Sequence, residues 1–165
     1  MTETHFDLLT SSSFQLAFPV LPSETSLSST EGLCLNTYGM VIPGLNIDQS
    51  EQRWMGAKSP VPEGTISFEP LSINFIVDSN LNNWKVLFNW LMYINNNFDT
   101  FVGRYDTYVV DTVLKMFDNF GEITVSLAFK NMWIQSLGEV TLSQREGEAT
   151  MECNAILSYD RFTVT

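Results

Sequence analysis

The stretch "TISFEPLSINFIVDSNLNNWKVLFNWL", residues 65–91, changes its hydrophobic period halfway along. In its first half, apolar side chains recur at every second position around a break at Glu69-Pro70: Ile66, Phe68, Leu71, Ile73, Phe75 and Val77. Alternation of this kind predicts half-buried strands, and the proline predicts a sheet edge or a bulge at the break. The second half repeats at about 3.6 residues, which predicts a helix over about 79–95. The fold therefore joins strands directly to a helix.

The residues of the predicted helix divide between two expected roles. One face is expected to pack in the core: Leu81, Trp84, Leu87, Phe88 and Leu91. Trp90 is rotated by about 100° from Leu91 and lies off this face. Because tryptophan is enriched at interface centres, Trp90 is the candidate for a contact with another subunit. Asp78 or Ser79 is expected to cap the helix.

Other alternating segments lie on both sides of this stretch, at about residues 14–18, 33–47, 107–117, 123–133 and 151–159. Strands in this number around one helix predict a mainly β fold, an antiparallel sandwich or barrel with the helix covering one open side. The length of 165 residues fits a single domain over 13–165, preceded by a flexible leader over 1–12.

Composition excludes several classes of function. The chain has 8 basic and 19 acidic residues and a net charge of −11, so it should repel nucleic-acid backbones and anionic membranes. No apolar run approaches the roughly 18 residues of a membrane helix. Cys34 and Cys153 are expected to be reduced, packed thiols. The acidic pair of Asp118 and Glu122 is expected in a solvated turn.

Catalytic chemistry is not expected either. His5 is the single histidine and lies in the polar leader, where no general base would be held in position. The chain contains no glycine-rich phosphate loop and no zinc or nucleophile motif. We therefore predict neither an enzyme nor a bound cofactor or metal.

Several motifs follow one another in a characteristic order along the chain. An early "FQLAFPVLP" strand is followed by "PG" and a polar segment that contains Trp54. Then come "FEPLSINFIVD", the asparagine-rich helix "NLNNWKVLFNWL", "AFKNMWIQSLGEVTL" and a last strand ending in "YDRF". This order resembles the tail tube proteins of contractile-tailed bacteriophages. The resemblance covers most of residues 13–162, and Trp133 through Gly138 correspond to the family's aromatic turn and corner.

The resemblance implies a structural role in a virion tail. Hexameric rings would join their strands into an inner β-barrel and stack into a tube, assembled in the host cytoplasm, that conducts DNA without specific binding. The implied partners are further copies of the chain, the tail sheath protein, the tape-measure protein and baseplate or terminator proteins. Trp90 then becomes a candidate for a subunit or sheath contact.

Residues 45–64 are expected to form a projecting arm that couples one ring to the next. The segment is polar around an aromatic–methionine centre, which is the composition of an interface core with a polar rim. A surface loop remains the alternative. The expected contact residues are Gln49, Glu51, Arg53, Trp54, Met55 and Lys58.

Two alternatives to the main tube subunit stay open. A baseplate tube initiator or tube-end protein of the same fold would form a single ring. A cytosolic ligand-binding β-barrel belongs to a different class, and it would enclose a small molecule among Phe68, Phe75, Trp84 and Phe88.

Overall fold

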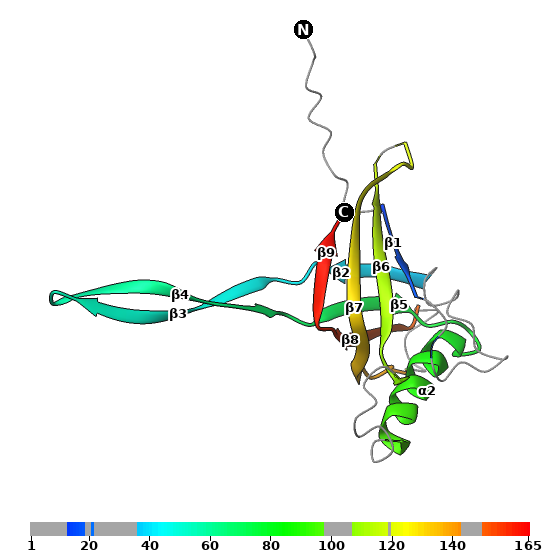
Figure 1. Cartoon of the computed structure of the whole chain (residues 1–165). Coiled ribbons are helices and arrows are strands. Elements are labelled where there is room, and N and C mark those ends of the chain that lie inside the picture. Colours follow the sequence, from blue (N-terminus) through cyan, green and yellow to red (C-terminus); the bar gives the residue numbers. More distant parts are fainter. Residues whose placement is uncertain (1–12, 19–20, 22–35, 98–106, 119, 143–149) are drawn as a thin grey trace, which may run out of the picture.

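The computed structural model describes residues 13–18, 21, 36–97, 107–118, 120–142 and 150–165 (Figure 1). Over these residues the chain forms nine strands and the helix α2: β1 (Phe14–Ala17), β2 (Thr37–Val41), β3 (Leu45–Trp54), β4 (Ala57–Phe68), β5 (Leu71–Ile76), α2 (Asn82–Asn96), β6 (Val110–Phe117), β7 (Ile123–Leu137), β8 (Glu152–Ser158) and β9 (Arg161–Val164). The predicted leader, with His5, lies outside the described residues, as does Cys34.

Seven strands form one antiparallel sheet, in the order β1-β6-β7-β8-β5-β2, with β9 paired to β7. The other two, β3 and β4, pair with each other as a separate hairpin. The predicted class, mainly antiparallel β with one helix, is confirmed over the described residues. None of the helices in that part of the chain has the length and apolar character needed to cross a bilayer.

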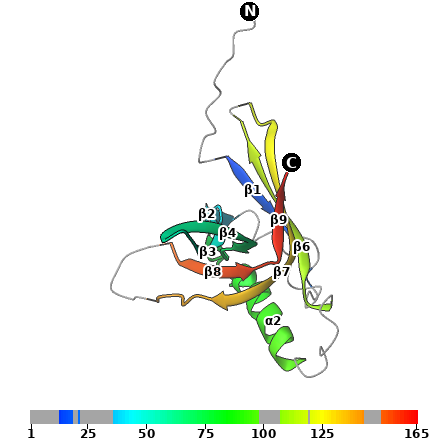
Figure 2. The ribbon, with the colours of Figure 1, turned by 60° about the vertical axis from the view of Figure 1, so that its left-hand side comes forward.

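Strand β7 bends and so belongs to two parts of the sheet. Its first part pairs with β6 and β9, and Trp133–Leu137 pair with β8. Asn131 lies just before the change of partner, which follows Met132, and its φ of 54 is a left-handed conformation that asparagine tolerates. In Figure 2 the strands β1, β6 and β9 accordingly run across the direction of β8. The resemblance placed the turn from Trp133 onward, whereas the strand bends at Asn131 and continues to Leu137.

Two carboxylates hold this bend, one on β6 and one in the connection between β8 and β9. Asp111 of β6 accepts a hydrogen bond from the Asn131 backbone N–H at 3.1 Å and forms an ion pair with Lys130. The Asn131 amide donates to Asp160 on the far side. The pKa of Asp111 is lowered by the hydrogen bond from Lys130, by the hydrogen bond from the Asn131 N–H and by the charge of Lys130. The Asp111 carboxylate therefore keeps its charge at neutral pH.

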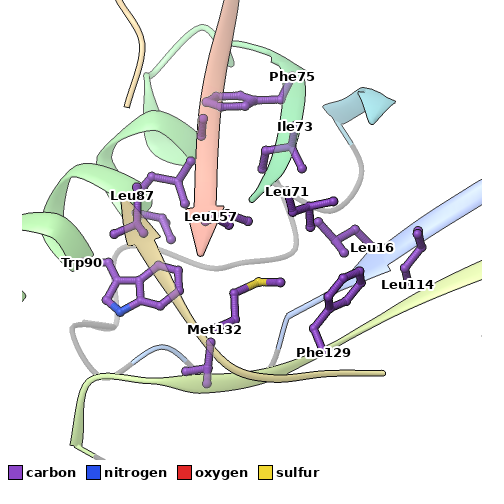
Figure 3. Close-up of a cluster of buried hydrophobic side chains, with 14 of the residues drawn as sticks. Leu16, Leu71, Ile73, Phe75, Leu87, Trp90, Leu114, Phe129, Met132 and Leu157 are labelled. Atoms are coloured by element: carbon purple, nitrogen blue, oxygen red, sulfur yellow. The ribbon is translucent and has the colours of Figure 1, made fainter. Parts of the chain in front are cut away.

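The core fills the space between the two parts of the sheet and the helix (Figure 3). Alternate residues of the paired strands β5 and β8 point into it, as their sequence periods predict. Its largest fully buried side chains are Leu16, Leu21, Leu71, Ile73, Phe75, Leu87, Trp90, Leu114, Phe129, Met132 and Leu157. Cys153 is a buried free thiol within this core, as predicted, and burial raises its pKa.

Helix α2 begins later than predicted, because Leu81 has the left-handed φ of 57 and ends a turn that starts at Asp78. Neither Asp78 nor Ser79 is the cap residue. The buried Asn83 joins the helix to β5 instead. Its side-chain oxygen accepts from the N–H of Asp78 at 3.1 Å and from that of Trp84 at 2.9 Å, and its amide donates to the Ile76 carbonyl at 2.7 Å.

We expect Asn83→Ala to lower the free energy of unfolding by about 2–3 kcal/mol, because buried backbone groups would lose their partners. Asn96→Ala, at an exposed position of the same helix, should change it by less than about 0.5 kcal/mol. Urea denaturation followed by circular dichroism measures both. Equal midpoints for the two variants would show that the Asn83 hydrogen bonds do not stabilise the fold.

Candidate assembly surfaces

One half of the described sheet ends in two edge strands. This half consists of the β7 segment Trp133–Leu137, then β8, β5 and β2. Among the described strands, β2 pairs with β5 alone, and Trp133–Leu137 pair with β8 alone. Unpaired strand edges readily accept a further strand, so both edges are candidates for pairing between copies.

The face of this half that points away from the core carries mainly uncharged polar side chains, together with Ile76, Ile156 and the acidic Glu152. The Asn154 amide donates to Ser72 at 2.9 Å and to Asn74 at 3.0 Å. The Ser158 hydroxyl donates to Gln135 at 2.8 Å. The Tyr38 hydroxyl donates to Glu152 at 2.7 Å, and this hydrogen bond to a carboxylate raises the pKa of Tyr38. None of the described side chains on this face is a cation that could hold a phosphate.

The β3–β4 hairpin leaves the body of the molecule as a long arm (Figure 1). Residues 45–64, which the sequence leaves open between an arm and a surface loop, therefore belong to a hairpin that spans 45–68. Its side chains are exposed over most of both strands, as expected for a hairpin without a second sheet beneath it. Pro60 and Pro62 lie on β4 opposite Glu51 and Gln49, and each lacks a backbone N–H.

An aromatic cluster holds the root of the arm. The ring of Phe68, the last residue of β4, packs against Tyr159 and Phe162, with centroids 6.1 and 5.7 Å away. The Tyr159 hydroxyl donates to the Glu69 carbonyl at 2.7 Å, and the Glu69 N–H donates to the Gly44 carbonyl at 3.2 Å. Burial, with the charge of Glu69, raises the pKa of Tyr159 to about 12, so this donor keeps its proton at neutral pH.

The predicted contact residues lie together at the outer part of the arm. Gln49, Glu51 and Arg53 are on β3, Trp54 ends that strand, Met55 is in the turn and Lys58 is on β4. The Trp54 side chain lies outside the described part of the structure. Lys58 and Glu51 form an ion pair at 2.7 Å between exposed side chains, and Arg53 lies directly opposite Lys58 in the strand register.

The predicted facing of the helix is wrong for Trp90, Phe88 and Leu81. The Trp90 side chain is 0% exposed, and its indole N–H donates to the Tyr108 carbonyl at 3.0 Å, so Trp90 is a core residue and not a surface residue available for a subunit or sheath contact. Phe88, predicted to be in the core, is 39% exposed, and Leu81 is exposed to a similar degree.

The remaining residues of the predicted core face differ from one another. Leu87 is buried, as predicted, whereas Trp84 and Leu91 are partly buried. Trp84 stacks on Phe88 with the ring centroids 5.0 Å apart. The buried residues of the helix are Leu87 and three residues outside the predicted face, Asn83, Val86 and Trp90.

The four aromatic residues proposed to line a ligand cavity do not face one interior space. Phe75 is in the core, Phe68 is in the cluster at the root of the arm, and Trp84 and Phe88 stack on the partly exposed side of α2. Among the described residues, no three His, Cys, Asp or Glu side chains gather at a point where they could hold a metal ion.

Comparison with known proteins assigns a family to this architecture. The family model described as phage tail tube protein matches residues 9–165. A tail tube terminator protein of Enterobacteria phage T4 is 28% identical over 142 residues, which are 83% of this chain and 81% of that protein. A tail tube protein of Serratia phage KSP90 is 27% identical over 149 residues, 90% of this chain and 77% of that protein.

A solved structure has the same fold. The tube-terminating cap of the anti-feeding prophage superposes with a TM-score of 0.69 at 17% identity, covering 100% of this chain and 99% of that one.

Proposed function

The chain belongs to the phage tail tube protein family, a family of structural proteins, and we propose that it closes into hexameric rings that stack into the inner tube of a contractile tail. The tube would be the conduit through which DNA leaves the virion. The observation that carries this proposal is the half-sheet, whose last described strands are β2 on one side and Trp133–Leu137 on the other.

Ring closure would join these two edges. The edges belong to different strands, so a contact between them is head-to-tail, and such a contact closes into a ring when its rotation permits. Pairing the β2 edge of one copy with the Trp133–Leu137 edge of the next would continue the half-sheet around the ring. It would also remove both edges from solvent, where they would otherwise promote uncontrolled association.

The polar face of the half-sheet would then line the channel. Asn154, Asn74, Ser72 and Gln135 are uncharged, and Glu152 is acidic. Six copies of a chain with a net charge of −11 would carry −66. Basic walls would hold DNA by releasing its counterions, whereas walls of this kind allow it to pass.

Stacking would use the arm. The β3–β4 hairpin extends from the body, and a hairpin of two strands without further packing is marginally stable by itself in water. Contact residues at Gln49, Glu51, Arg53, Trp54, Met55 and Lys58 would dock on the adjacent ring. By family membership we propose the tail sheath, the tape-measure protein and baseplate or terminator proteins as further partners, with assembly in the host cytoplasm.

The purified protein at micromolar concentration is expected to form rings, or tubes built from them. Mass photometry would show hexamers rather than a single 18.7 kDa species, and negative-stain microscopy would show the rings directly. A protein that stays monomeric in both measurements would contradict the proposed function.

A single-ring tube terminator is a second candidate, favoured by the similarity to the terminator of phage T4. The same micrographs distinguish the two roles. A tube subunit should give stacks of variable length, whereas a terminator should give separate rings that cap preformed tubes.

A further inference from the structure

The two most exposed large apolar side chains of the described structure lie at the tips of its two longest hairpins. Met55 at the tip of the arm is 95% exposed, and Phe120 between β6 and β7 is 86% exposed. We propose that the arm tip of one copy docks on the β6–β7 tip of a copy in the next ring, through Met55, Arg53, Phe120 and Glu122. This inference rests on the proposed function and names the surface on which the arm docks.

The backbone at the arm tip is unfavourable for the residue that occupies it. Met55 and Gly56 have φ values of 49 and 84, and they join Trp54 to Ala57 in a two-residue turn. Turns with positive φ at both positions favour Asn-Gly or Asp-Gly, because asparagine and aspartate tolerate the left-handed region. Water does not stabilise the exposed, apolar methionine side chain either. A partner that covers Met55 would explain why a residue unsuited to both the turn and the solvent occupies this position.

The arm tip also carries uncompensated positive charge on an acidic chain. Arg53 and Lys58 lie directly opposite each other on paired strands, where like charges are destabilising. Lys58 is paired with Glu51 at 2.7 Å, and no acidic side chain in the described part of the chain forms an ion pair with Arg53. An acidic partner outside the copy would relieve this repulsion.

The β6–β7 tip has the complementary properties, and hydrogen bonds connect its described residues. One carboxylate oxygen of Asp118 accepts from the N–H of Phe120 at 2.8 Å and from that of Glu122 at 2.9 Å. The Gly121 N–H donates to the Asp118 carbonyl at 3.2 Å, and Gly121 has a φ of 82. These bonds hold the turn that presents Phe120, with acidic groups on both sides of it.

The two tips can meet only between copies. Figures 1 and 2 show the arm and the β6–β7 hairpin leaving the body in different directions. A basic tip with a thioether would face an acidic tip with an aromatic ring, and sulfur–aromatic and arginine–aromatic contacts are both favourable. The surfaces differ, so the contact is head-to-tail and can be repeated from ring to ring.

Met55→Asn separates a docking role from a structural one. Asparagine suits the turn better than methionine, so the arm should remain folded while the docking contact is lost. We expect the amount of protein in tubes, measured by sedimentation and negative-stain microscopy, to fall by about tenfold or more, with rings retained. Phe120→Ser should have the same effect. Leu142→Ser, at an 80% exposed position away from both tips, is the matched control and should leave tubes unchanged.

A charge exchange tests the pairing itself. Arg53→Glu and Glu122→Arg should each reduce tube formation, and the double variant should recover it. The contact would be overturned if Met55→Asn formed normal tubes, or if the double variant formed no more tubes than either single variant. Tubes formed by the wild-type protein would still support the proposed function in either case. A wild-type protein that forms neither rings nor tubes would overturn both, and one that forms rings without stacking would overturn the contact.

Discussion

Trp90→Ala is expected to lower the free energy of unfolding by about 3–5 kcal/mol, the loss typical of a fully buried aromatic side chain. The Trp90 ring is 0% exposed and lies among Leu87, Met132 and Leu157 in the core (Figure 3). Truncation would leave a cavity between the helix and the sheet. It would also remove the hydrogen bond to the Tyr108 carbonyl, which measures 3.0 Å. Thermal or urea denaturation of the monomer would measure the loss.

Two further variants make this result specific. Trp90→Phe keeps most of the apolar volume and should cost less than Trp90→Ala. Phe88→Ala removes an aromatic side chain that is 39% exposed on the same helix and should cost about 1 kcal/mol. If Phe88→Ala destabilises the protein as much as Trp90→Ala, the facing of α2 described here is incorrect.

Shortening the arm is expected to abolish tube formation without unfolding the protein. Asn-Gly in place of residues 48–65 would join Ile47 to Ile66, which already face each other in the strand register. This dipeptide favours the two-residue hairpin turn that the new connection needs. Among the described side chains, the core contains none from the replaced segment, so the melting temperature should change by only a few degrees. Rings should still close, because the edges proposed for closure lie outside the arm.

Trp54→Ala tests the same dependence of stacking on the arm with a single substitution. If Trp54 anchors the arm on the adjacent ring, its loss should weaken stacking strongly, because buried aromatic anchors contribute most of the energy of an interface. The variant should fold and still close rings. Tubes of normal length from Trp54→Ala or from the shortened arm would show that stacking does not depend on the arm.

The sequence predicts this fold well wherever one face of an element is polar. In β5, Leu71, Ile73 and Phe75 alternate with Ser72 and Asn74, and the structure buries the apolar set. The helix has no such contrast, because apolar residues occur around most of its circumference and periodicity alone does not select a face. Which face of the helix packs in the core depends on Asn83, whose side chain forms hydrogen bonds with Ile76 and Asp78. These contacts form only in the folded chain, so the periodicity of the sequence does not indicate them.

The sequence predicts less of the candidate assembly surfaces than of the fold. The composition of residues 45–64 indicates an exposed segment, and Trp54 and Met55 indicate an interface. The left-handed backbone of Met55 is a property of the turn, which no pattern of apolar residues reports. Likewise, the bend at Asn131 depends on carboxylates from β6 and from residue 160, which approach it only in the folded chain.

Pro60 and Pro62 bear on how the protein avoids amyloid-like aggregation before it assembles. An exposed two-stranded hairpin resembles the template from which cross-β fibrils grow, because its outer backbone groups can recruit further strands. Proline has no N–H to offer, so these two residues interrupt the ladder that a recruited strand would need. We therefore expect the β4 edge of the arm to be a poor template for fibril growth, while the exposed side chains of the arm stay available for contacts.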